Sequence, residues 1–194
     1  PFFLGPSLGI MDWLPQKLEV FHNNFHGLKV KVASSLFGDG TGAESMASAI
    51  RGRVREVIQR EGLRCPFVAL VDHGTPAKGV NEVRERVAEI VESLLGREVS
   101  GLASCSMERR AEPEYDFNDP LLVNLLQERN VVSAGDVVVA LLFLSPGRHA
   151  GTGGDVEVIC DEVRGDRDDL RTFLTEPLGE HPAIVDLLEQ RVRE

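Results

Sequence analysis

Two histidines and a glutamate each follow a segment with the pattern of a buried strand. His73 comes just after the apolar run 67–71, Glu108 lies just past the segment 101–107, and His149 follows the longest apolar run in the chain. Because the carboxyl ends of parallel strands meet at one edge of a sheet, we expect these side chains to face one cleft. Imidazole and carboxylate groups bind divalent transition metals and accept protons. Each residue alone is more typical of a polar loop than of a functional site, so the prediction rests on their shared placement.

Glycines stand beside both histidines. Gly74 follows His73 directly, and Gly147 lies two residues before His149 in the glycine-rich segment 145–155. A residue without a Cβ lets the backbone come close to a bound molecule. The glycines therefore favour a flat ligand packed against these two loops.

Strand-like and helix-like segments alternate through the second two thirds of the chain. Continuous apolar runs are typical of parallel strands buried on both faces, and apolar residues three or four apart are typical of helices. Asp119 is expected to cap the second helix of this part. The repeated order predicts an α/β fold, a three-layer α/β/α sandwich with a parallel sheet. The predicted strands are 67–71, 98–104, 137–144 and 170–174, and the predicted helices are 80–94, 121–129, 156–163 and 181–194.

The first third of the chain predicts a helix, a strand and a second helix. These elements cover 12–25, 28–33 and 44–61, and the last of them ends at Gly62. The first helix is expected to turn its large apolar residues inward, namely Trp13, Leu14, Leu18, Phe21 and Phe25.

Two short passages of the chain recur in the same order. "FFLGPS" at 2–7 is similar to "LFLSPG" at 142–147, and "RVRE" occurs at both 53–56 and 191–194, with nearly the same spacing. Such a repeat indicates two copies of one structural unit. We expect residues 1–64 to be the C-terminal half of a first unit that continues upstream of Pro1, and residues 65–194 to be a complete second unit.

Composition excludes several classes of function. The net charge of −10 argues against nucleic acids and anionic membranes as partners. The longest apolar run, 137–144, is too short to span a bilayer. The three cysteines are isolated, which favours free thiols in the cytoplasm. Neither a P-loop nor a GxSxG motif is present.

Three passages resemble the CbiX/SirB family of sirohydrochlorin chelatases. They read "VALVDHGTP", "SMERRAEP" with "DFNDPLL", and "LFLSPGRHAGTGGD". The resemblance implies ATP-independent insertion of a divalent metal into sirohydrochlorin, with the metal as substrate and no organic cofactor. His73 and His149 match the catalytic and metal-binding histidines of the family. Glu108 matches the acidic residue between them, and Glu112 is the alternative.

The resemblance also implies a substrate rich in carboxylates, and guanidinium groups pair with carboxylates through two hydrogen bonds. The expected substrate-binding residues are Arg148, Arg109, Gly74 and Gly147, with Arg110 beside them. The first-unit position that corresponds to His149 is Gly9. We therefore expect the working site in the second unit.

The metal and the assembly stay open at this point. The family resemblance favours Co²⁺ and cobalamin synthesis, Fe²⁺ for sirohaem is the alternative, and Ni²⁺ stays open. A protein that binds a tetrapyrrole or a metal without catalysis is a third possibility. Two fused units predict a monomer with pseudo-dimeric symmetry, and a homodimer is the alternative.

Overall fold

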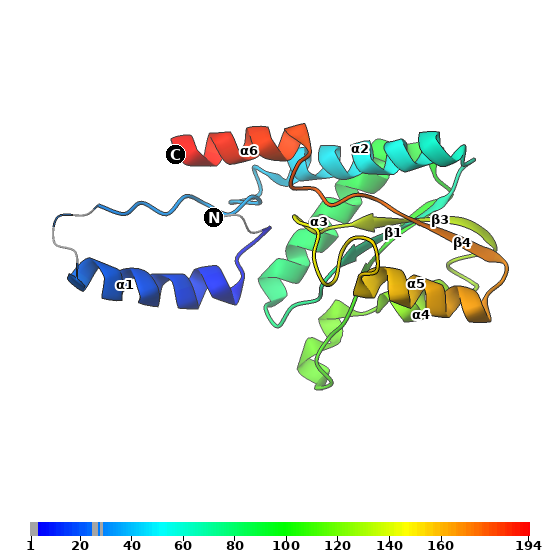
Figure 1. The fold of residues 1–194 in the computed structure, drawn as a ribbon, viewed down its shortest axis with the longest axis horizontal. Coiled ribbons are helices and arrows are strands. Elements are labelled where there is room, and N and C mark those ends of the chain that lie inside the picture. Colours follow the sequence, from blue (N-terminus) through cyan, green and yellow to red (C-terminus); the bar gives the residue numbers. More distant parts are fainter. Residues whose placement is uncertain (1–3, 25–26, 28) are drawn as a thin grey trace.

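A parallel four-stranded sheet forms the centre of the computed structural model, which describes residues 4–24, 27 and 29–194 (Figure 1). The strand order is β2-β1-β3-β4, and every neighbouring pair is parallel. The strands are β1 (Phe67–Asp72), β2 (Gly101–Ser106), β3 (Gly135–Leu141) and β4 (Leu170–Leu174). All four predicted strands are confirmed, with shifts of a few residues at their ends.

Helices cover both faces of the sheet and make the three predicted layers. On one face lie α2 (Ala43–Glu61) and α3 (Lys78–Leu95), and α6 (Pro182–Arg193) packs beside α2. On the other face lie α4 (Leu122–Gln127) and α5 (Asp155–Asp166). Short helices of other types span Gly9–Trp13, Gly96–Glu98 and Pro113–Asn118.

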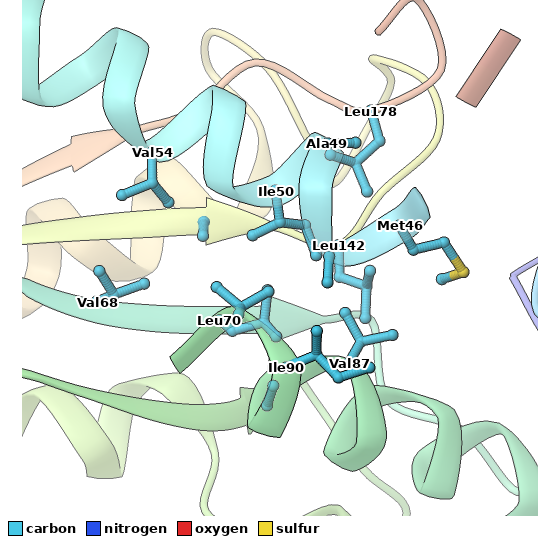
Figure 2. Packing of buried hydrophobic residues seen from close by; sticks show 14 of the residues in the cluster. Met46, Ala49, Ile50, Val54, Val68, Leu70, Val87, Ile90, Leu142 and Leu178 are labelled. Atoms are coloured by element: carbon cyan, nitrogen blue, oxygen red, sulfur yellow. The ribbon is translucent and has the colours of Figure 1, made fainter. Parts of the chain in front are cut away.

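Each strand contributes alternate residues to two separate cores. In β1, Val68 and Leu70 pack with residues of α2 and α3 (Figure 2), whereas Ala69 and Val71 pack with residues of α4 and α5. Successive side chains of a strand point to opposite faces, so a strand between two helical layers must be apolar throughout. This explains the uninterrupted apolar runs in the sequence.

The register places the ends of the central strands side by side. Asp72 pairs with Ser106 across β1 and β2, and Val71 pairs with Leu141 across β1 and β3. The residues that follow these strands therefore emerge at one edge of the sheet, as the sequence predicted.

The first third of the chain differs from its predicted packing. The predicted helix is present as α1 (Leu14–Asn24), but it extends away from the three layers (Figure 1). Trp13 is 59% exposed and Phe21 is 43% exposed, so their predicted inward orientation is wrong. Phe25 lies outside the described residues. An amphipathic pattern shows which side of a helix is apolar, and not whether a surface is present to cover it.

The strand predicted at 28–33 is also wrong over its described part. Residues 29–33 form neither a strand nor a helix, and Leu28 lies outside the described residues. A strand needs a neighbour for its backbone hydrogen bonds, and the described sheet supplies none here.

The predicted cap of α4 is wrong as well. The helix begins at Leu122, and Leu121 occupies the N-cap position. Asp119 instead ends the preceding short helix, where its N–H donates to the carbonyl of Asp116 at 3.0 Å.

Within the described part of the chain, no helix combines the length and hydrophobicity that crossing a membrane requires.

Candidate active site

His73 and His149 meet at the sheet edge where β1 and β3 end. Their ring centroids are 4.6 Å apart, with an interplanar angle of 71°. His73 follows β1 directly, and His149 lies in the loop between β3 and α5. Both side chains are partly exposed, His73 at 45% and His149 at 31%. The two imidazoles are 76 positions apart in the sequence. They meet because the strands that precede them, β1 and β3, are neighbours in the sheet.

Glu108 reaches the same place from the loop after β2. Its Oε1 lies 3.5 Å from Nε2 of His73, so of the two candidate glutamates it is the one paired with this histidine. The backbones of the two loops are joined as well. The N–H of Met107 donates to the carbonyl of Asp72 at 2.7 Å, and the N–H of Glu108 donates to the carbonyl of His73 at 3.2 Å.

Gly74 is required for this junction. Its φ is +92°, and a Cβ at this position would lie 1.9 Å from the carbonyl oxygen of Glu108. Only glycine fits such close contact with another backbone at this φ. The packing of the His73 loop on the Glu108 loop thus requires glycine at this position, and the predicted contact of Gly74 with the substrate stays a prediction.

His149 is held by a carboxylate that the sequence analysis missed. Its Nδ1 lies 2.6 Å from Oδ2 of Asp155, the first residue of α5. The backbone supports the pair, because the N–H of Asp155 donates to the carbonyl of Arg148 at 3.0 Å. The available signal was the position of Asp155 at the start of a helix, after the glycine-rich segment, where acidic residues are favoured.

The hydrogen bonds define which nitrogen each imidazole offers. Nδ1 of His149 faces the Asp155 carboxylate, and Nδ1 of His73 lies 3.1 Å from the carbonyl oxygen of Gly74. A carbonyl and an ionised carboxylate only accept hydrogen bonds, so each Nδ1 carries the proton in these pairs. Nε2 of each ring is then the atom left for a metal ion or a proton.

The arrangement is an open site. Across the described residues, no three His, Cys, Asp or Glu side chains are arranged closely enough to hold a metal ion. The site offers two imidazoles and one carboxylate, and the Glu108 side chain is 63% exposed. Among the described residues no more than two of these groups can reach one ion in this arrangement, so a metal bound here would keep several coordination positions for another molecule.

Comparison with known families decides the relationship. A family model for CbiX matches residues 67–194. The chain belongs to the CbiX family. Its family segment begins at β1 and includes the loops of both histidines and Glu108. No curated protein sequence matches the chain significantly.

Solved structures confirm the chelatase-like fold of this CbiX-family chain. The sirohydrochlorin chelatase SirB from Bacillus subtilis subspecies spizizenii, in complex with cobalt, has a TM-score of 0.69 and 15% identity, over 100% of this chain and 66% of that chain. SirB from Bacillus subtilis with Fe³⁺ has a TM-score of 0.65 and 15% identity, over 100% of this chain and 69% of that chain. CbiX, described as the terminal enzyme for biosynthesis of siroheme in denitrifying bacteria, has a TM-score of 0.62 and 12% identity, over 100% of this chain and 73% of that chain. The chain thus spans about two thirds of the first of these relatives.

Two cavities lie on either side of His73. One, of about 240 Å³, is mainly apolar and is lined by Leu4, Val80 and residues 142–144. The other, of about 360 Å³, is lined by Glu108, Arg109 and Arg110 together with residues 73–76. An apolar cavity and a cationic cavity therefore meet at one imidazole.

The three arginines predicted to bind the substrate differ in their availability. Arg109 contacts two carboxylates, Asp116 at 3.0 Å and Asp119 at 3.1 Å. Arg110 donates to the hydroxyl of Tyr115 at 2.9 Å and lines the cationic cavity. The side chain of Arg148 is 84% exposed, and its Nε lies 3.5 Å from the carboxylate of Asp155. Arg148 and Arg110 are thus the more available for an incoming anion, whereas Arg109 is already paired.

The cysteines do not join the site. All three are free, and burial raises the pKa of the Cys160 thiol to about 12 and the pKa of the Cys105 thiol still further. Both thiols are therefore neutral at physiological pH and poor metal ligands, because the thiolate is the form that binds metals.

Thiol reactivity tests this assignment. In the native protein at pH 8, we expect only the exposed Cys65 to react rapidly with a chromogenic disulfide reagent. Cys105 and Cys160 should react at the rate of unfolding, and rapidly once denaturant is added. Fast reaction of all three thiols without denaturant would contradict the burial of two of them.

Proposed function

We propose that this chain carries the active site of a sirohydrochlorin chelatase, which inserts Co²⁺ into sirohydrochlorin for cobalamin synthesis without ATP. The observation that carries the proposal is the meeting of the His73 and His149 rings, 4.6 Å apart, each with Nε2 left available by its Nδ1 hydrogen bond. Membership of the CbiX family supports this activity. Fe²⁺ is the alternative metal, since one similar structure contains cobalt and another contains Fe³⁺.

Metal insertion requires two changes at the same place. The metal must exchange its water ligands for pyrrole nitrogens, and the macrocycle must lose two N–H protons. The Nε2 atoms of His73 and His149 are placed to bind the incoming metal or to accept these protons. Glu108, 3.5 Å from Nε2 of His73, stabilises that imidazole when it is protonated. The open ligand set suits a metal that is passed on rather than retained.

The two cavities fit the two parts of a tetrapyrrole. The apolar cavity beside Val80 and Leu142 can receive an edge of the macrocycle, and the cationic cavity beside Arg110 can receive its peripheral carboxylates. Arg148 is exposed on the His149 loop and can pair with another carboxylate. Arg109 acts in this proposal by shaping the cationic cavity, because Asp116 and Asp119 already pair with it.

We further propose that residues 1–64 belong to a first chelatase-like unit and residues 65–194 form the second, which carries the site. The two "RVRE" passages support this division, because the first lies on α2 and the second at the C-terminal end of α6, and these two helices pack side by side. If α2 and α6 are the corresponding helices of the two units, their contact is where the two units join.

The test of the proposed activity is an anaerobic insertion assay. The protein is mixed with sirohydrochlorin and either Co²⁺ or Fe²⁺, and the absorbance change is compared with that of a protein-free mixture. Acceleration by the protein supports the chelatase, and the faster metal identifies the pathway. Tetrapyrrole binding without acceleration would instead identify a non-catalytic binding protein.

Asp155 offers a separate test of the His149 geometry. Asp155→Asn should lower kcat/KM by about 10–100-fold, because an amide no longer fixes the proton on Nδ1 of His149. Asp161→Asn is the matched control, since this carboxylate lies on the same helix and pairs only with Arg164 among the described ion pairs. Equal activity of the two variants would show that Asp155 does not govern His149.

A further inference from the structure

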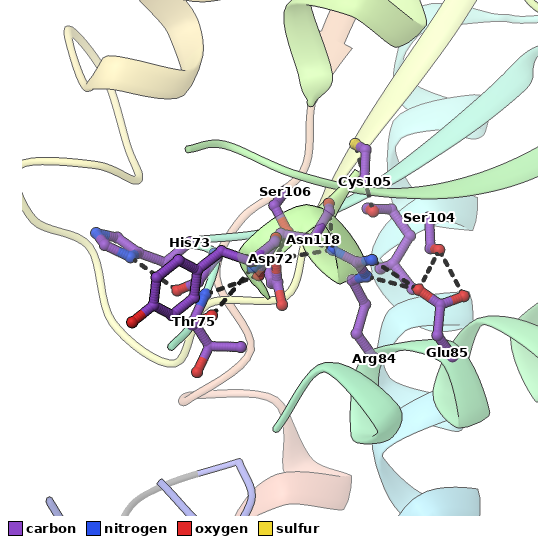
Figure 3. A network of polar contacts seen from close by, with 12 residues as sticks. Asp72, His73, Thr75, Arg84, Glu85, Ser104, Cys105, Ser106 and Asn118 are labelled. Carbon is purple, nitrogen blue, oxygen red and sulfur yellow. Dashed lines mark hydrogen bonds and ion pairs between the residues drawn. The ribbon is translucent and has the colours of Figure 1, made fainter. Parts of the chain in front are cut away.

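A buried polar network lies directly beneath His73 (Figure 3). Asp72, the last residue of β1, is 6% exposed, and Arg84 of α3 is 1% exposed. Ser106 and Asn118 are fully buried at 0%. Four polar side chains from four different elements therefore converge at the edge of an otherwise apolar core.

Asp72 links this network to the loop of His73. Its Oδ1 accepts hydrogen bonds from the backbone N–H of Gly74 at 3.0 Å and from the hydroxyl of Ser106 at 2.7 Å. Arg84 lies 3.3 Å from the same oxygen and also contacts the hydroxyl of Ser106. The Asp72 carboxylate thus fixes the backbone of Gly74, and these two residues flank His73.

Asn118 fixes the next residue of the same loop. Its Oδ1 accepts from the N–H of Thr75 at 2.9 Å, and its Nδ2 donates to the carbonyl of Thr75 at 3.0 Å. One side-chain amide therefore pairs with both backbone groups of Thr75, as a neighbouring strand would. The carbonyl of Asn118 in turn accepts from Arg84 at 3.3 Å, and its Nδ2 also donates to the carbonyl of Tyr115 at 2.9 Å.

Stability alone is a poor explanation for this network. A buried ion pair loses hydration, and well-packed apolar residues of the same size are often equally stabilising or better. The geometric result of the network is more specific. It fixes backbone groups of Gly74 and Thr75, and the N–H of Glu108 donates to the carbonyl of the intervening His73.

We propose that Asn118 is a positioning residue for metal insertion, acting through the loop 73–75 to hold His73 against Glu108 and opposite His149. Arg84 holds Asn118 and Asp72 in place from below. The inference rests on the proposed chelatase activity, but it concerns a residue that touches neither the metal nor the tetrapyrrole. Its effect is expected in the rate of insertion and in metal affinity, and not in tetrapyrrole affinity.

Two variants of Asn118 give a graded test in the intact chain. Asn118→Asp keeps the oxygen that accepts from Thr75 but loses the two Nδ2–H donors, and Asn118→Ala loses the whole amide. We expect kcat for Co²⁺ insertion to fall by about 10–100-fold in the alanine variant and by less in the aspartate variant. KM for sirohydrochlorin should stay within about twofold, because the cavities keep their walls.

Asn81→Ala is the matched control. Asn81 is also a buried asparagine, 5% exposed, but it lies on α3 and its Nδ2 has no hydrogen-bond partner among the described residues. Thermal unfolding and circular dichroism report the folding of each variant. A folded Asn118→Ala protein with unchanged kcat would overturn the proposal. So would an equal loss of kcat per degree of lost Tm in Asn81→Ala and Asn118→Ala, because the loss of activity would then follow stability alone.

Co²⁺ binding without tetrapyrrole separates this inference from the proposed activity. Positioning of His73 predicts that Asn118→Ala binds Co²⁺ about 10-fold more weakly than the wild type, as read from the visible spectrum of the bound ion. If the wild type inserts no metal but this difference in Co²⁺ affinity remains, the activity fails and the positioning role stands. If the wild type inserts metal and both kcat and Co²⁺ affinity survive in Asn118→Ala, the positioning role fails alone.

Discussion

His149→Ala should lower kcat/KM for metal insertion by about 10²–10⁴-fold, the contribution expected of a side chain that moves a proton or holds a reacting group. His73→Ala should have an effect of the same order, because the two rings face each other and offer the same atom, Nε2. The measurement is the rate of sirohydrochlorin metallation under anaerobic conditions, at saturating and at limiting metal. A loss of rate at limiting metal alone would identify binding of the metal ion as the main role of the histidine. A loss of rate at both metal concentrations would indicate a role in proton transfer as well.

His181→Ala is the control for these two variants. This histidine caps α6, where its Nδ1 accepts from the N–H of Ala183 at 3.2 Å, and it lines neither of the two cavities beside His73. We expect some loss of stability from the missing cap and unchanged insertion by the folded protein. Wild-type activity in both His73→Ala and His149→Ala would remove the basis of the proposed site.

Gly74→Ala should abolish insertion and lower the free energy of unfolding by about 2–4 kcal/mol. Two effects add at this position. The φ of +92° strains any residue with a Cβ, and that Cβ would meet the carbonyl oxygen of Glu108 at 1.9 Å. The loops of His73 and Glu108 must separate to relieve the contact, which breaks the backbone hydrogen bond between them. Denaturant unfolding gives the stability, and the metallation assay gives the activity.

Gly62→Ala separates backbone strain from the steric contact. Gly62 follows α2 with a φ of +65°, and a Cβ there would have no atom within 4 Å. We expect a loss of about 1 kcal/mol and unchanged insertion. If Gly74→Ala were no more harmful than Gly62→Ala, the close junction of the two site loops would be wrong.

The strands and the paired histidines were predictable because they depend on short-range patterns. A strand between two helical layers must be apolar on both sides, so runs such as 67–71 stand out in the sequence. Parallel order then follows from the alternation with helices, and it brings the loops after β1, β2 and β3 to one edge. His73, Glu108 and His149 could be placed together on these rules alone.

The supporting residues could not be found in the same way. Arg84 lies among the apolar residues of α3, and a charged residue in a helix is usually exposed. Asn118 reaches Thr75 across 43 positions, which no local pattern records. The packing of α1 was mispredicted for the opposite reason, since its amphipathic pattern is real but the described chain leaves Trp13 and Phe21 exposed. Local patterns therefore predicted which side chains meet at the sheet edge, and tertiary contacts were needed to show what orients them.

The two imidazoles are attached to the molecule in different ways. His73 is one residue from a central strand, and its neighbours Gly74 and Thr75 are held by buried side chains. His149 lies in a loop rich in glycine, held mainly by the first turn of α5. Rings in edge contact at 4.6 Å leave no room for a macrocycle between them. If the tetrapyrrole enters between the rings, we expect the His149 loop to swing outward while His73 stays still, so that substrate entry and product release depend on the motion of one side only.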